Sequence, residues 1–306
     1  MIEMVIEARR KDLGELEVGR ILPFARRRMV GPFVFLDHMG PADFQPGEGV
    51  NVRPHPHIGL STVTYLFDGE ILHRDNLGYT QPIRPGEVNW MTAGRGIVHS
   101  ERTDPSLRST GGLMHGMQAW VALPLEQEEA EPGFFHHEQA DLPTYEGGGM
   151  WARLIAGEAF GAKANIKTHS PMFYVHWELQ PGAKAQLPAE YPERAAYVAR
   201  GSVEVDGRTY STGQMLVFEP GQPVLFAGAG EGPATVMLLG GEPVGPRIIW
   251  WNLVASSQDR IERAKADWAN PGASGRFSLP AEDSAEFIPL PHDWRGEPEP
   301  SPPGPN

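Results

Sequence analysis

Short segments rich in β-branched and aromatic residues recur along the chain, with glycine and proline at close intervals between them. In residues 61–67, Val63, Tyr65 and Phe67 alternate with threonine and leucine, so one face is bulkier and more apolar. Alternation with a period of two is typical of a strand with one buried face. Other segments of this kind are residues 30–36, 88–91, 117–123, 172–179, 195–205 and 215–218. The pattern predicts an all-β protein built as a sandwich or barrel.

One segment near the C-terminal end follows a helical period instead. Ile261, Ala264 and Trp268 fall on one face, and Ser256 with Asp259 resembles a capping box. We therefore expect a helix over residues 257–269. The residues from 290 to 306 contain too much proline to pack, so we expect a disordered tail there.

The chain has 306 residues, about twice the usual length of one domain, and its two halves resemble each other. Residues 65–69 match residues 197–201, and residues 85–94 match residues 212–221 in order and spacing. An acidic, glycine-rich stretch over residues 124–150 separates the halves. We expect an N-terminal barrel over residues 1–135 and a second barrel with the helix over residues 136–289.

The charge composition limits which kinds of molecule the protein is expected to bind. Acidic residues outnumber basic ones by 39 to 26, and a net charge of −13 disfavours direct binding of nucleic acid. The one basic cluster, Arg26 to Arg28, is more typical of a solvated rim, and a basic partner protein stays open. There is no apolar run of membrane-spanning length, no secretory signal and no cysteine, so we expect a cytoplasmic protein outside the membrane.

Two pairs of polar residues at i and i+2 carry the candidate chemistry. His55-Pro56-His57 places two imidazoles on one side of an extended strand, and His99-Ser100-Glu101 repeats the geometry. Two such pairs on neighbouring strands can converge on one point inside a barrel. Three imidazoles and a carboxylate suit a first-row divalent ion and leave coordination positions open, as in catalytic sites. The alternative is that these are ordinary polar residues at strand ends.

The second half lacks this donor set. When the halves are matched, Phe226 falls opposite His99, and Leu187 and Ala189 fall opposite His55 and His57. Metal is therefore predicted in the first half alone.

Other polar and aromatic candidates carry weaker predictions. His115, with Met114 and Met117 nearby, either lines the pocket or packs beside a strand. Packing is the default for Trp90 and Met91. Four other histidines carry weaker predictions: His136 and His137 are expected to be solvated, and His38 and His73 have no partner at ligand spacing.

Long runs around the histidines resemble the signature of the pirin family, a branch of the cupin superfamily with two cupin domains. These runs are RPHPHIGL (53–60), TVTY (62–65), MTAGRGIVHSE (91–101) and QAWVALP (118–124). The resemblance implies two jelly-roll barrels and a C-terminal helix, with one metal-binding barrel. In the wider cupin pattern a glutamate stands where this chain has Thr62, and in pirins the carboxylate ligand moves to the position of Glu101.

The resemblance also implies a cofactor and two functions. It implies a mononuclear Fe(II) site at His55, His57, His99 and Glu101, although other divalent first-row metals suit the same donors. The first function is a dioxygenase that opens a small aromatic flavonol such as quercetin with O2, with Glu101 accepting the hydroxyl proton. The second is a redox-responsive regulator that acts through a protein partner, either a transcription factor or a metabolic enzyme.

Overall fold

The computed structural model describes residues 1–14 and 16–291, and these residues are mostly β-strand. They form two compact units. The histidine unit comprises Lys11–Val18, Val34–His137 and the described residues from Gly245 onward. The apolar unit comprises Met1–Arg10, Gly19–Phe33 and Glu138–Val244. No helix in the described part of the chain is both long enough and apolar enough to span a membrane.

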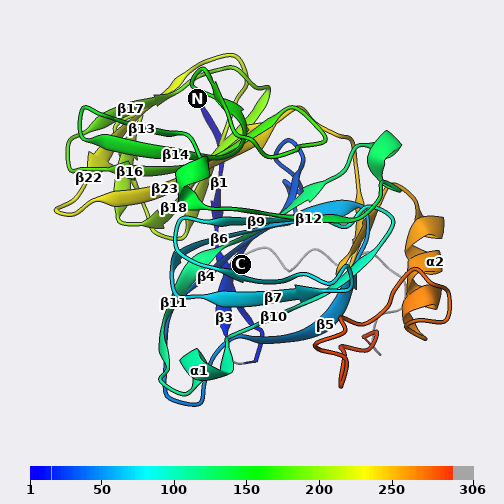
Figure 1. Cartoon of the computed structure of the whole chain (residues 1–306). Helices are drawn as coiled ribbons and strands as arrows, with labels where there is room; N and C mark the ends of the chain where they lie inside the picture. Colours follow the sequence, from blue (N-terminus) through cyan, green and yellow to red (C-terminus); the bar gives the residue numbers. More distant parts are fainter. Residues whose placement is uncertain (15, 292–306) are drawn as a thin grey trace. The chain divides into compact units, whose positions relative to one another are not determined.

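Two main sheets contain the strands of the histidine unit, although residues 9–10 and 19–22 of these strands are grouped with the apolar unit. The larger has the order β12-β9-β6-β11-β4-β3-β2, and the smaller has the order β5-β10-β7-β8. Figure 1 shows β7 and β10 of the smaller sheet side by side. Their bounds are β2 (Arg9–Asp12), β3 (Glu17–Leu22), β4 (Phe33–Phe44), β5 (Asn51–His57), β6 (Leu60–Asp68), β7 (Ile71–Asp75), β8 (Thr80–Ile83), β9 (Val88–Thr92), β10 (Ile97–Arg102), β11 (Gly112–Ala122) and β12 (Gly133–His137). The short elements of this unit are α1 (Pro105–Arg108), the 3-10 turn Leu125–Gln127, the hairpin β24 (Ile248–Trp250) and β25 (Leu253–Ala255), and α2 (Gln258–Trp268).

The apolar unit has the same arrangement of a large and a small sheet. The large sheet has the order β1-β21-β18-β23-β16-β14-β13, with β15 paired to β14, and the small sheet has the order β17-β22-β19-β20. The expected pair of jelly-roll β folds is confirmed by these sheets. The bounds are β1 (Ile2–Glu7), the 3-10 turn Gln139–Asp141, β13 (Thr144–Gly147), β14 (Met150–Ala159), β15 (Ala162–Lys163), β16 (Met172–Leu179), β17 (Lys184–Leu187), β18 (Glu193–Arg200), β19 (Ser202–Val205), β20 (Arg208–Ser211), β21 (Gln214–Phe218), β22 (Val224–Ala229) and β23 (Ala234–Gly241).

Strand pairing corrects the register between the two halves. Ala185 pairs with Phe226 in the apolar unit as His55 pairs with His99 in the histidine unit. With Phe226 opposite His99, the residue that corresponds to His55 is Ala185 rather than Leu187. The sequence comparison matched His55 with Leu187, two residues too far along the chain, because it aligned His55 and His99 from two different motifs. The conclusion about donors is unchanged, since these side chains of the apolar unit form part of its core.

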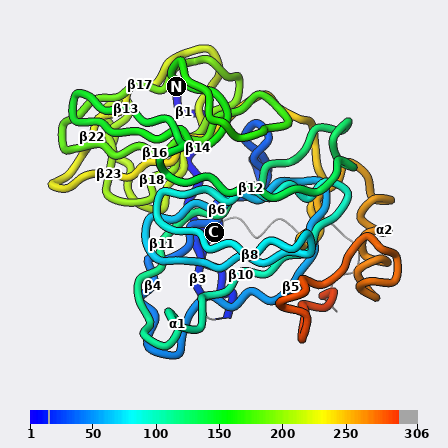
Figure 2. The backbone as a smooth tube through the Cα atoms, viewed as in Figure 1, coloured from blue at the N-terminus to red at the C-terminus, as the bar shows by residue number. Residues whose placement is uncertain are grey.

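The C-terminal elements pack on the histidine unit. Ile58, which lies between β5 and β6, and Val98 of β10 share a core cluster with Leu253, Ile261 and Trp268. Figure 2 shows the red end of the described chain running beside β5. The compact units therefore differ from the continuous ranges 1–135 and 136–289: apolar burial assigns α2 to the histidine unit.

The ends of the C-terminal helix also differ in detail from the sequence prediction. The N-cap residue of α2 is Ser257, without a hydrogen bond from its side chain. The Ser256 hydroxyl instead donates to Glu128 Oε2 at 2.7 Å, so the predicted capping box is wrong. Of the expected tail, Leu290 packs against the helix cluster, and residues 292–306 lie outside the described residues.

Candidate metal centre

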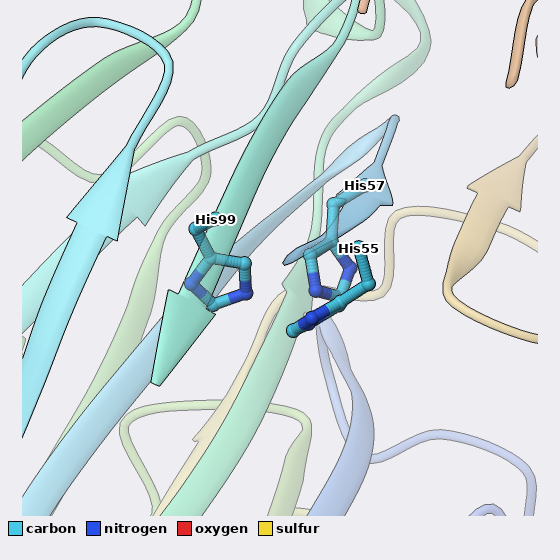
Figure 3. A group of neighbouring side chains, drawn as sticks. All are labelled: His55, His57 and His99. Carbon is cyan, nitrogen blue, oxygen red and sulfur yellow. The ribbon is translucent and has the colours of Figure 1, made fainter. Parts of the chain in front are cut away.

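Three histidines from two paired strands converge within the histidine unit. His55 and His57 come from β5 and His99 from β10, and one ring nitrogen of each lies within 4.8 Å of those of the other two. Ring centroids are 4.4 Å apart for His55 and His99 and 5.1 Å apart for His57 and His99. All three are buried, with exposed fractions of 5%, 1% and 1%. Figure 3 shows the ring of His99 facing the other two.

The irregular pairing of β5 with β10 accommodates the prolines beside these histidines. His99 pairs with His55, but Glu101 pairs with Val52, so β5 has one extra residue in this interval. Pro54 lies in the interval and cannot donate a ladder hydrogen bond, which makes a bulge the natural place for it. His99 and Glu101 therefore lie on opposite sides of the bulge: His99 pairs with a histidine of β5, and Glu101 pairs with Val52.

Backbone carbonyls fix the tautomers of His55 and His57. The Nδ1 atom of His55 lies 2.8 Å from the carbonyl oxygen of Arg53, and that of His57 lies 2.9 Å from the carbonyl oxygen of Asn252. A carbonyl oxygen only accepts, so each Nδ1 must carry the proton and donate it. In the neutral ring the lone pair is then at Nε2, the form that ligates a metal.

His99 reaches the same tautomer by a different route. Its Nδ1 atom lies 3.4 Å from Nδ1 of His73, whose Nε2 lies 2.9 Å from Oδ2 of Asp75. The carboxylate accepts from His73 Nε2, and in that tautomer the lone pair of His73 lies at Nδ1, which accepts from His99 Nδ1. The Nε2 atom of His99 is then left buried and without a hydrogen-bond partner among the described residues. A buried lone pair of this kind requires a partner.

Burial keeps the three rings neutral. Burial lowers the pKa of His55 to about 4, and it lowers the pKa of His57 and of His99 well below the usual value. Repulsion between the neighbouring imidazoles lowers the last two further. Neutral imidazole is the protonation state that binds a divalent cation.

Glu101, the fourth residue predicted from sequence, lies on β10 outside this group of three. The single hydroxyl hydrogen of Thr64 is shared between two acceptors, Gln118 Oε1 at 2.8 Å and Glu101 Oε1 at 3.4 Å. Burial raises the pKa of Glu101 to about 7, although the Thr64 hydrogen bond opposes this shift. Its role as a ligand and as a base stays a prediction.

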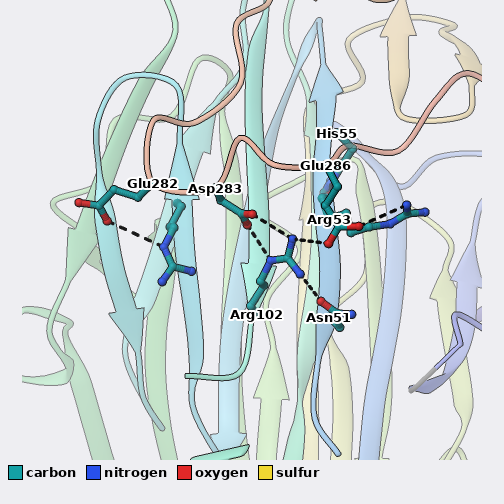
Figure 4. A network of polar contacts seen from close by, with 8 residues as sticks. Asn51, Arg53, His55, Arg102, Glu282, Asp283 and Glu286 are labelled. Atoms are coloured by element: carbon teal, nitrogen blue, oxygen red, sulfur yellow. Dashed lines mark hydrogen bonds and ion pairs between the residues drawn. The ribbon is translucent and has the colours of Figure 1, made fainter. Parts of the chain in front are cut away.

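Hydrogen bonds and ion pairs connect the C-terminal segment to β5 and β10, the strands that carry the histidines. Arg102 of β10 donates to Asp283 through Nε at 2.6 Å and through Nη2 at 3.0 Å, and it also contacts Glu286 and Asn51. Figure 4 shows this network. In addition, the backbone N–H of residue 288 donates to a β5 carbonyl at 2.8 Å. Bidentate pairing fixes the geometry of an arginine better than a single contact does.

His38 and His73, for which no partner at ligand spacing was predicted, both have polar contacts in the structure. Besides His73, the Nε2 atom of His38 lies 2.7 Å from Nε2 of His115, so His115 belongs to a buried pair and not to the group of three. His136 lies on β12 and its Nδ1 is 2.8 Å from Oδ1 of Asn89. Its solvated placement was wrong because the acidic stretch contains strand β12, which pairs with β9.

Trp90 and Met91 are buried core residues, as expected from their apolar side chains. His73 was missed as a contributor to the site. Its i, i+2 spacing with Asp75 was the signal that could have shown it.

Comparison with known proteins identifies the family. The Pirin family model matches residues 15–121, and the model of the pirin C-terminal cupin domain matches residues 174–275. A pirin-like protein of Caulobacter vibrioides is 65% identical over 294 residues, which is 95% of this chain and all of that protein. The chain belongs to the pirin family. The fold and the two cupin domains are those that the sequence resemblance implies.

Solved structures support the same fold. A quercetin 2,3-dioxygenase from Acinetobacter baumannii is similar, with a TM-score of 0.86, 33% identity and 94% of each chain covered. A second quercetin 2,3-dioxygenase structure from the same organism has a TM-score of 0.81 and 28% identity, covering 91% of this chain and 98% of that one.

The residues of this pirin-family site fit a metal ion. Three buried imidazoles present lone pairs from Nε2, and that of His99 is otherwise unpartnered. Such a donor set suits iron, nickel, copper or zinc and leaves coordination positions for a substrate. Among the described residues, this is the group that could hold an ion.

Proposed function

We propose that this chain is a mononuclear metal-dependent dioxygenase that opens a flavonol-like substrate with O2. His55, His57 and His99 would hold the metal, with Glu101 as the fourth ligand and Fe(II) as the resident ion. The observation that carries the proposal is the convergence of three neutral, buried imidazoles with their lone pairs at Nε2. The similarity to quercetin 2,3-dioxygenases of known structure supports the choice of reaction.

The chain's own groups suit the handling of a flavonol hydroxyl. Bound Fe(II) would draw electron density from the substrate's oxygen and provide the redox-active centre for O2. Glu101 is positioned by Thr64 and would accept the hydroxyl proton, since a base near neutral pKa is effective for proton transfer. The ring centroid of Trp120 lies 5.2 Å from that of His57, edge-on, and 3.9 Å from that of Phe35, on which it stacks, so that side of the site is lined by aromatic rings.

Metal reconstitution tests the proposal. The protein is loaded anaerobically with Fe(II), its metal content is measured, and O2 uptake and carbon monoxide release are followed with quercetin. We expect turnover proportional to bound iron, and weaker turnover with nickel, copper or zinc in its place. A fully loaded protein without turnover on any flavonol or related enediol would overturn the enzyme and favour the regulator that acts through a protein partner.

A further inference from the structure

The three histidines of the metal centre are supported in two different ways. His55 and His57 each donate from Nδ1 to a backbone carbonyl, which has no alternative protonation state. His99 faces a second histidine, His73, and behind it the carboxylate of Asp75. His73 and Asp75 are both buried, with exposed fractions of 4% and 2%. One ligand of three therefore depends on an ionisable pair.

The surroundings hold this pair in one geometry. The ring of His73 stacks on Phe134 with centroids 4.2 Å apart and an interplanar angle of 13°. The Oδ1 atom of Asp75 accepts from the backbone N–H groups of Leu77 at 2.9 Å and Tyr79 at 3.1 Å. The other oxygen, Oδ2, is thereby directed at His73 Nε2 at 2.9 Å. Neither ring nor carboxylate can turn without breaking these contacts.

We propose that His73 and Asp75 are positioning residues of the metal centre, which keep the proton of His99 on Nδ1 and its lone pair on Nε2. This inference rests on the proposed metal site. The carboxylate draws the hydrogen of His73 Nε2, which leaves His73 Nδ1 as an acceptor. His99 must then donate from Nδ1, and the negative charge at the end of the chain strengthens its Nε2 as a donor.

The substitution Asp75→Asn tests this relay at one atom. The amide oxygen can still accept from Leu77 and Tyr79, so the turn is preserved. The amide nitrogen replaces Oδ2 and donates to His73 Nε2, which moves the His73 proton to Nδ1. His99 Nδ1 then accepts, and its own proton moves to Nε2, where it blocks the metal. An asparagine in place of the aspartate of a Ser-His-Asp triad traps its histidine in the wrong tautomer by the same logic.

The apolar unit provides a matched control. His176 and Glu178 of β16 form another pair at i and i+2, with His176 Nε2 3.0 Å from Glu178 Oε1, and His176 is buried. Glu178→Gln makes the same chemical change in a unit whose described residues contain no group of metal-ligating side chains. It should leave metal binding as in the wild type.

The experiment is a titration with Co(II), followed by calorimetry and by the visible absorption of the bound ion. We expect Asp75→Asn to bind Co(II) 10- to 100-fold more weakly than wild type, the usual effect of losing a partner behind a metal-bound histidine, and to shift the Co(II) bands. His73→Phe preserves the stacking on Phe134 and should show the same loss. If Asp75→Asn fails to fold, His73→Phe provides the test in its place.

Separate outcomes overturn the inference and the proposed function. Co(II) affinity within twofold of wild type and unchanged bands in the folded variants would make the pair purely structural. Equal weakening by Glu178→Gln would also overturn the inference, because the effect would then be general destabilisation. A wild-type protein that binds no Co(II) would contradict the proposed metal site itself.

Discussion

The Nδ1 atom of His57 lies 2.9 Å from the carbonyl oxygen of Asn252, 195 positions further along the chain. Asn252 lies in the turn between β24 and β25, beside Trp251, which has a φ of 53°. That left-handed conformation turns the chain tightly within two residues. A residue far along the chain therefore orients one of the three candidate metal ligands. The geometry of this candidate metal centre depends on the C-terminal hairpin as well as on β5 and β10.

Weakening the C-terminal cluster should consequently weaken the metal centre. Trp268 is fully buried, and its indole Nε1 donates to the carbonyl oxygen of Ile288 at 2.9 Å. We expect Trp268→Ala to lower the free energy of unfolding by about 3–5 kcal/mol, the usual cost of so large a cavity. Metal affinity should fall too, because the hairpin with Asn252 shares this cluster. Urea unfolding and calorimetric metal titration measure both effects, and loss of stability with full metal affinity would contradict the coupling.

Loss of one ligand should empty the site. We expect wild type to bind one metal ion per chain and His57→Ala to lose metal and dioxygenase activity together. Phe226→Ala is the comparison in the apolar unit, since Phe226 occupies the position that matches His99 there. That variant should lose stability but keep one metal per chain, as measured by elemental analysis. Two ions per chain in the wild type would contradict the predicted difference between the halves.

The sequence predicted the fold and the three histidines because both depend on local periodicity. The i, i+2 spacing of His55 and His57 places two rings on one side of a strand whatever lies around it. The pattern placed α2 in the second half, as the pirin C-terminal model over residues 174–275 also does, but it could not show that the helix packs on the histidine unit. Ile58 and Val98 share its core cluster there, and their closeness to the helix follows only from tertiary packing. Asn252 could not have been found, because any residue type offers a carbonyl.

The metal-free protein should lose stability as the pH falls below neutral. Burial, and to a smaller extent the neighbouring His115, lower the pKa of His38 to about 4; Asp68 lies 3.8 Å from His115. Between pH 6.5 and 4 the unfolded chain therefore binds more protons at His38 than the folded chain does. The contribution of neutral His38 to the free energy of unfolding is complete above pH 6.5 and is lost as the pH falls towards 4.

The substitution His38→Asn isolates this contribution. We expect the drop in unfolding free energy between pH 7 and pH 5 to be about 2 kcal/mol smaller in the variant. Urea unfolding at the two pH values, in the presence of a chelator, measures the difference. An unchanged drop would show that other groups, such as the buried metal-site histidines, account for the pH dependence.

The role of Glu101 separates catalysis from metal binding. Glu101→Gln keeps the shape and one oxygen donor of the side chain, and Thr64 can still donate to that oxygen. The amide cannot accept the proton of a flavonol hydroxyl. We therefore expect iron to be partly retained while turnover per bound iron falls by about 100-fold, the usual scale for loss of a general base.

Oxygen uptake at equal iron loading provides this comparison. Thr64→Val is a useful second variant, because it removes the hydrogen bond to Glu101 but leaves the carboxylate. Its turnover should lie between those of wild type and Glu101→Gln. If Glu101→Gln kept full turnover per iron, the proton would have to leave by another group. If it lost iron as completely as His57→Ala does, Glu101 would be needed mainly to hold the metal.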